Sequence, residues 1–122
     1  MRIIFIACIM FLSAFCKAGE LPSSVKQEVE HLFHQLESSG CKFNRNGSWY
    51  TATEAAAHIR KKYDYLVGKN LLKSTESFIE NAATESSMSG KSYQVECEGQ
   101  AVILSSVWFN NKLKVYRSKK NH

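Results

Sequence analysis

Apolar residues recur at intervals of three and four in four stretches of the chain, a spacing that places them on one face of an α-helix. Each stretch follows a hydroxyl side chain that can cap the first helical turn, and these caps are Ser24, Thr51, Ser74 and the pair Ser105-Ser106. Gly40 suits the left-handed position after the first helix, and Gly68 marks the end of the second. The pattern therefore predicts about four helices.

A small β-hairpin is predicted before the last helix. Residues 93–97 alternate between polar and apolar side chains, residues 98–100 form a turn, and residues 101–104 return as a second strand. Residues 41–50 are predicted to be irregular or partly extended around an Asn46-Gly47 turn, because both residues tolerate positive φ. The expected fold is α+β and mainly helical.

The first 18 residues differ from the rest of the chain. Met1-Arg2 is a short basic start, residues 3–15 are an almost unbroken apolar run, and Ala18 stands at a site suited to cleavage. This order is typical of a cleaved secretory signal peptide. A spanning helix needs about 20 apolar residues, so we expect no membrane span after cleavage. Residues 19–122 then form a single small domain, with a frayed basic tail at 117–122.

Loss of the signal peptide changes both the charge and the cysteine count. Without Arg2 and Lys17, 14 of the 16 basic residues remain against 11 acidic ones, a net charge of +3. This charge is too small and too scattered to predict a nucleic-acid partner. Cys41 and Cys97 remain, and an even pair in an exported chain predicts one disulfide, worth about 4 kcal/mol of stability. Their wide spacing does not favour a metal site.

Three polar side chains of the second predicted helix share one stripe. Glu54, His58 and Lys62 are spaced four residues apart. A glutamate beside a histidine can raise its pKa and orient its ring, as a general base requires. With Ser87 or Ser89 as nucleophile, the group would make a small hydrolase, although no G-x-S-x-G motif is present. The simpler interpretation is that Glu54 caps the helix and the serines belong to a flexible loop, so we do not expect an enzyme.

A second set of side chains favours binding over catalysis. Arg45 and Trp49 flank the Asn46-Gly47 turn, and both residue types are common at binding hot spots. The interpretation we favour for Trp49 is a place in the core under the disulfide, whereas Arg45 is expected to meet a partner or Glu54. No cofactor or metal motif occurs, so none is expected. The candidate binding residues are Arg45, Asn46, Trp49, Glu54, His58, Lys62, Ser89 and Lys91.

Several of these motifs together carry a family resemblance. They are Ser39-Gly40-Cys41, Phe43, Arg45-Asn46-Gly47-Ser48-Trp49-Tyr50, Glu54-Ala55, His58, Lys62-Tyr63, Tyr65-Leu66, Ser74-Thr75-Glu76, Phe78-Ile79, Ser86-Ser87, Ser89-Gly90, Tyr93, Val95 and Cys97. In these motifs the chain resembles the YfeK-like family, small exported proteins of Gram-negative bacteria with a domain of unknown function. The resemblance covers essentially the whole mature chain and implies a periplasmic location. It implies no activity.

The loop at residues 87–93 is similar, in loop chemistry alone, to the Ser-Gly-rich loop that periplasmic inhibitors of C-type lysozyme insert into the enzyme's cleft. We expect a non-enzymatic binding or accessory protein of the periplasm, whose partner is an unknown periplasmic protein or envelope component. The alternatives are the small serine-dependent hydrolase, an inhibitor of lysozyme-like enzymes, and a purely structural envelope protein.

Overall fold

Residues 20–121 are described by the computed structural model, and the predicted signal peptide at 1–18 lies outside them. The elements in chain order are α1 (Ser23–Ser38), β1 (Lys42–Arg45), β2 (Ser48–Thr51), α2 (Ala52–Gly68), α3 (Thr75–Ala82), β3 (Gln94–Glu96), β4 (Ile103–Leu104) and α4 (Ser105–Lys120). Four helices and one small antiparallel sheet confirm the predicted α+β, mainly helical class. Within this part of the chain, no helix has both the length and the apolarity needed to cross a membrane.

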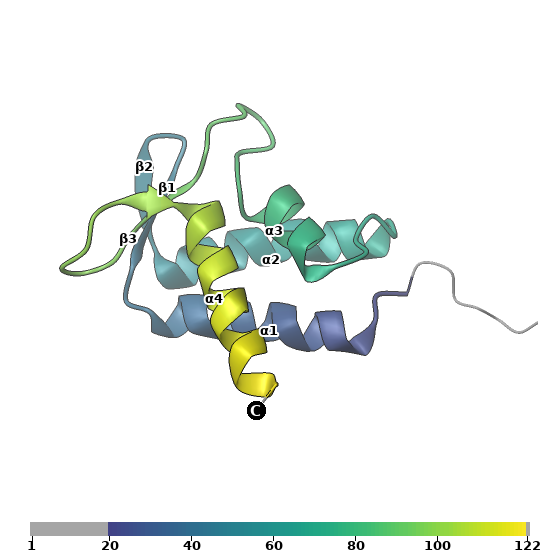
Figure 1. Cartoon of the computed structure of the whole chain (residues 1–122). Helices are drawn as coiled ribbons and strands as arrows, with labels where there is room; N and C mark the ends of the chain where they lie inside the picture. Colours follow the sequence, from purple (N-terminus) through teal and green to yellow (C-terminus); the bar gives the residue numbers. More distant parts are fainter. Residues whose placement is uncertain (1–19, 122) are drawn as a thin grey trace, which may run out of the picture.

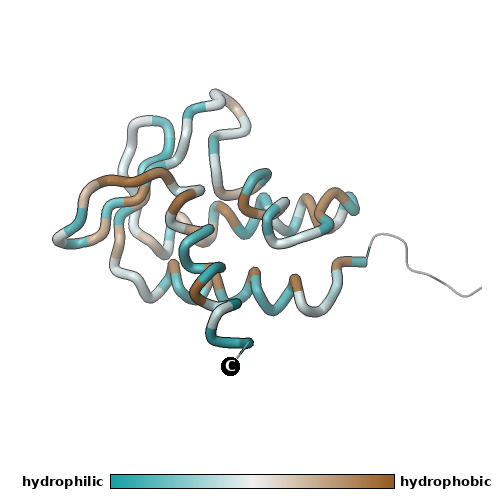
Figure 2. The backbone as a smooth tube through the Cα atoms, in the orientation of Figure 1, coloured by the Kyte–Doolittle hydropathy of each residue, from teal (hydrophilic) through white to brown (hydrophobic). Residues whose placement is uncertain are grey.

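The four helices pack around an aromatic core. α1 packs beside α2, α4 crosses α1, and the sheet lies at one end of the helices (Figure 1). Phe78 of α3 meets Phe33, Tyr63 and Phe109 edge to face, with ring centroids 5.4–6.4 Å apart. Figure 2 shows apolar residues in brown recurring among polar ones along the helices. This is the periodic pattern from which the helices are predicted.

The sheet is larger than the predicted hairpin, because residues 42–51 also form strands. The strand order is β2-β1-β3-β4, and every pairing is antiparallel. The turn residues Asn46 and Gly47 have φ angles of 53° and 84°, which confirms the predicted turn. The segment at residues 41–50, predicted to be irregular or partly extended around this turn, thus forms a regular hairpin. Phe43 is the one buried residue of β1 and β2, so their alternation is too weak to recognise in the sequence.

Two of the four predicted helix caps are present. Thr51 accepts a hydrogen bond from the Glu54 amide at 3.1 Å, and Ser74 forms a reciprocal capping box with Ser77. The Ser24 cap is wrong, because α1 begins at Ser23 and Pro22 occupies its N-cap position. The Ser105-Ser106 cap is also wrong, because α4 begins at Ser105 and Leu104 occupies its N-cap position. The backbone amide of Ser105 donates to the carbonyl of Tyr93 beside the sheet.

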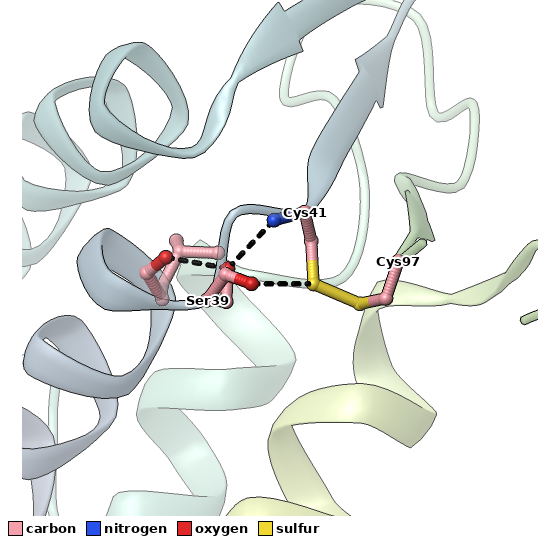
Figure 3. The surroundings of a disulfide bond; sticks show 4 residues. Ser39, Cys41 and Cys97 are labelled. Atoms are coloured by element: carbon pink, nitrogen blue, oxygen red, sulfur yellow. Dashed lines mark hydrogen bonds between the residues drawn. A yellow bond between two sulfur atoms is a disulfide. The ribbon is translucent and has the colours of Figure 1, made fainter. Parts of the chain in front are cut away.

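The predicted disulfide between Cys41 and Cys97 is present (Figure 3). It joins the residue before β1 to the residue after β3, with the two Cα atoms 4.2 Å apart. The amide of Cys41 also donates to the hydroxyl of Ser39 at 3.1 Å. The bond therefore fixes the two central strands next to the end of α1.

Trp49 lies outside the core, contrary to the favoured prediction. Its side chain is 43% exposed on the edge strand β2. Phe43 pairs with Tyr50 across the hairpin, and Asn44 pairs with Trp49. Successive side chains of a strand point to opposite faces of the sheet. Since Phe43 takes the core face, Trp49 takes the other one.

The last helix extends beyond the predicted boundary. α4 is helical through Lys120, where the sequence predicts a frayed tail from residue 117. Arg117 donates to both carboxylate oxygens of Glu28 on α1, at 2.8 and 2.9 Å, and to Glu76 on α3. These ion pairs hold the end of α4 against α1 and α3. The sequence pattern could not predict them, because their partners lie far from Arg117 in the sequence.

Candidate functional site

His58 and Lys62 of α2 converge on one buried hydroxyl group. The Nε2 atom of His58 and the Nζ atom of Lys62 each lie 3.3 Å from the Oη atom of Tyr93. Lys62 also donates to the backbone carbonyl of Glu85 at 3.0 Å. The four-residue spacing thus places His58 and Lys62 on one stripe, as predicted. Tyr93 is the residue immediately before β3, and sequence reasoning missed it as a site residue.

Glu54 does not orient His58. Its carboxylate accepts a hydrogen bond from the Thr51 hydroxyl at 3.0 Å, so it serves the start of α2. The partner of His58 is instead Arg45 of β1, whose Nη1 lies in hydrogen-bond contact with the Nδ1 atom of the imidazole. Arg45 also lies over the Tyr50 ring, 4.9 Å from its centroid. The suggested pair between Arg45 and Glu54 is therefore replaced by an Arg45 contact with His58.

The Arg45 contact determines the protonation of His58. A guanidinium group can only donate hydrogen bonds, so Nδ1 must accept. In the resulting neutral imidazole, Nε2 carries the hydrogen and donates it to Tyr93. Burial, followed by the charges of Arg45, Lys62 and Lys61, lowers the pKa of His58. The raised pKa expected from a neighbouring glutamate is thus wrong, because cations surround the ring.

Lys62 experiences the same environment. Burial lowers its pKa, the charge of Glu85 raises it, and the charge of Arg45 lowers it again, with a net downward shift. Its Nζ atom also lies 5.1 Å from the centroid of the Tyr93 ring. Lys62 is therefore a partly buried donor, rather than the solvated charge that its position on the predicted stripe suggests.

The serine loop is joined to the β1–β2 turn through Asn46. The Asn46 amide donates to the Ser86 hydroxyl at 3.2 Å and accepts from the Ser89 hydroxyl at 2.5 Å. Ser86 is only 5% exposed, and its hydroxyl also accepts from the amide of Met88. The structure thus brings the predicted turn and loop together. Their hydroxyls bond to Asn46, whereas both ring nitrogens of His58 bond elsewhere.

Two pockets adjoin along α2, with His58 and Lys61 in the lining of both. The first, about 330 Å³, lies toward the hairpin and includes Arg45, Tyr50 and Glu54. The second, about 310 Å³, lies toward α3 and is also lined by Lys62, Tyr65, Leu66, Asn81 and Ser87. Pockets of this size can take a small organic ligand. Lys61 and Tyr50 are lining residues that the candidate set omits, since no single sequence motif links them.

Two further candidates lie at the edges of this region. Trp49 lines a separate hollow of about 190 Å³ with Lys42, Tyr50, Thr51 and Glu54. Lys91 is exposed, and its amide donates to the Ser89 hydroxyl at 3.2 Å. Between residues 20 and 121, no three His, Cys, Asp or Glu side chains lie close enough together to hold a metal ion.

The family comparison covers this whole region. Residues 23–117 match the Family of unknown function (DUF5329). The chain belongs to this family. No curated protein and no solved structure matches it. The DUF5329 region runs from the first residue of α1 to Arg117 of α4 and includes every candidate site residue. The narrower YfeK-like name and the Gram-negative origin stay predictions.

Proposed function

We propose that this DUF5329 protein is a non-enzymatic binding or accessory module of the bacterial periplasm. Its binding face is built from Arg45, the 46–49 turn, His58, Lys62 and the 86–91 loop. The main support is the convergence of Arg45, His58 and Lys62 beside two pockets. Across residues 20–121, no carboxylate lies within salt-bridge distance of Arg45, Lys61 or Lys62.

The proposed location rests on two features. Residues 1–18 have the order of segments found in secretory signal peptides. The disulfide between Cys41 and Cys97 is of a kind that persists in oxidising compartments such as the periplasm. Cell fractionation tests this location directly, with the mature protein expected in the periplasmic fraction. Recovery of the uncleaved chain in the cytoplasm would contradict it.

A pull-down from periplasmic extract tests the binding face. The wild-type protein is compared with an Arg45→Ala/His58→Ala double variant, and circular dichroism checks that the variant is folded. A matched Lys69→Ala/Lys114→Ala variant removes two exposed cations elsewhere. We expect a partner that the wild type and the control retain and the first variant loses. Equal capture by all three proteins would mean that the face is wrong.

The exposed loop offers one specific version of binding. Met88 is 96% exposed near the tip of the loop, while Asn46 fixes the loop through Ser86 and Ser89. A fixed, projecting loop suits insertion into the cleft of a lysozyme-like enzyme. A lysozyme assay with and without the purified protein tests this version. We expect the protein to inhibit lysozyme and Met88→Ala to weaken the inhibition. Lysozyme activity that stays unchanged at excess protein would rule out this version.

The hydrolase alternative rests on Ser87 and His58, which line the same pocket. A serine-reactive phosphonate probe would label a catalytic serine, and His58→Ala would abolish the labelling. The neutral imidazole leaves no ring nitrogen available, because Arg45 and Tyr93 occupy both. The binding proposal therefore predicts no labelling of the wild type.

A further inference from the structure

The two pockets along α2 are parts of one cleft with a cationic centre. His58 and Lys61 line both pockets, so the wall between them is only about one helical turn wide. Arg45 lies in the first pocket and Lys62 in the second. A ligand longer than either pocket would therefore pass directly across His58 and Lys61.

The charges around this cleft are unbalanced. Arg45, Lys61 and Lys62 contribute three positive charges, and Glu54 is the one carboxylate among the lining residues. Glu54 is hydrogen-bonded to Thr51, and Glu85 acts on Lys62 from outside the lining. Arg45 has five N–H donors, of which only one has a hydrogen-bond partner in the described chain. The remaining donors suit an oxyanion, which arginine recognises through paired hydrogen bonds.

Apart from Asn81 and Ser87 in the second pocket, the remaining lining is apolar or aromatic. Phe43, Tyr50, Ala55 and Ala57 line the first pocket, and Tyr65 with Leu66 lines the second. Tyr65 is an exposed aromatic side chain, and such side chains commonly cover the apolar part of a ligand. A purely inorganic anion would leave these walls uncovered.

Building on the proposed binding function, we infer that this cleft binds a small organic anion whose charged group lies between Arg45 and Lys61 and whose apolar body extends toward Tyr65. Carboxylates and phosphate esters share the chemistry that this site recognises. Neutral His58 fits the same arrangement, since its Nδ1 holds the guanidinium group in place without competing for the anion.

Three probes with one aromatic body test the inference on the purified protein. 4-Phenylbutyrate carries a carboxylate, 4-phenylbutyl phosphate carries a phosphate, and 4-phenylbutanol is neutral. Binding is followed by two-dimensional NMR, whose peak dispersion also reports folding. We expect at least one anion to bind about tenfold more tightly than the alcohol. The shifted amides should cluster at Arg45, His58 and Lys61, and the better anion identifies the charged group.

Charge variants complete the test. Lys61 is exposed and has no ion pair in the described chain, so Lys61→Gln should fold normally and weaken anion binding severalfold. Lys69→Gln, at the C-cap of the same helix, is the matched control and should bind like the wild type. Equal binding of the alcohol and the anions would overturn the inference while leaving a binding face intact. If none of the three probes shifts any amide peak, the inference is also overturned. The pull-down then tests the proposed function separately.

Discussion

Two arginines of this protein, Arg117 and Arg45, have opposite surroundings. Arg117 is paired with Glu28 and Glu76, and Glu28 also accepts from the buried Thr75 hydroxyl at 2.6 Å. Arg45, by contrast, contacts a histidine and lies near Lys62, and it has no carboxylate partner among residues 20–121. The first arrangement joins α1, α3 and α4. The second places like charges together, which lowers stability and leaves donors for a ligand.

The difference shows which region serves the fold and which is available for function. Hydrogen bonds from Arg117 lower the pKa values of Glu28 and Glu76, so the folded state favours their charged forms. Around His58, burial and cations lower the pKa of the base, so the folded state favours its neutral form. Perturbed groups of the second kind beside a pocket are typical of functional sites.

The largest expected effect comes from breaking the paired region. Glu28→Gln removes one of the two carboxylate charges that Arg117 contacts and weakens the acceptor for Thr75. We therefore expect a loss of about 2 kcal/mol in the free energy of unfolding. Urea denaturation measures it. Glu30→Gln is the control, since its pair with Arg60 is solvent-exposed and worth less than about 1 kcal/mol. Equal losses in both variants would contradict the structural role of the Glu28 cluster.

A smaller effect is expected from the contact that stabilises the binding face. Asn46→Asp keeps the size of the side chain but removes the donor to Ser86, and we expect a loss of about 1 kcal/mol. Hydrogen exchange of the Met88 and Ser89 amides should accelerate, because their acceptor Ser86 is less firmly held. Asn111→Asp on α4 is the control, since Asn111 is exposed and its side chain has no hydrogen-bond partner among residues 20–121. Unchanged exchange at residue 88 would show that Asn46 does not order the loop.

The two regions should lose stability in different pH windows. A histidine with a depressed folded pKa contributes stability above its unfolded value, about 6.5, and loses it as pH falls toward the folded pKa. His31 has the same sign, with burial as the main cause. Glu28 and Glu76 contribute above about 4.5 and lose stability below it.

Thermal melting across this range separates the two windows. His58→Gln should flatten the stability curve immediately below pH 6.5, and Glu28→Gln should flatten it below pH 4.5. His31, which stacks on Tyr116, also contributes to the loss of stability just below pH 6.5. A His31→Gln variant measures that contribution separately. If His58→Gln changed the stability only below pH 4.5, the electrostatic account of the site would be wrong.

The smallest expected effect is on stability in the site itself. Lys61→Gln should change the free energy of unfolding by less than about 0.5 kcal/mol, because Lys61 is exposed and has no ion pair in the part of the chain described. The pKa of His58 should nevertheless rise slightly, since one of the cations that lower it is gone. NMR titration of the imidazole measures this rise. A fall in the pKa would contradict the assigned surroundings.

Local patterns predicted the features that depend on neighbouring residues. The helices, the Asn46-Gly47 turn and the caps at Thr51 and Ser74 follow from spacing and turn chemistry. The β1–β2 hairpin escaped prediction because Phe43 alone carries its buried face. Trp49 is predicted to lie in the core under the disulfide, and the strand register instead places it on the opposite face of the sheet.

The site was only half predictable for a related reason. The stripe of Glu54, His58 and Lys62 follows from helical geometry, and its position beside Arg45 does not. Tyr93 lies 35 positions from His58 in the sequence, so only the folded sheet brings the two together. Glu54 has two available roles in the sequence, and its bond to Thr51 selects the capping one.

The measurement that tests this account most directly is the NMR titration of His58 with and without phenylbutyrate. The account predicts a pKa below 6.5 in the free protein, and a higher pKa when an anion offsets the charges of Arg45 and Lys61. A free value at or above 6.5 that phenylbutyrate leaves unchanged would contradict the cationic, ligand-binding site.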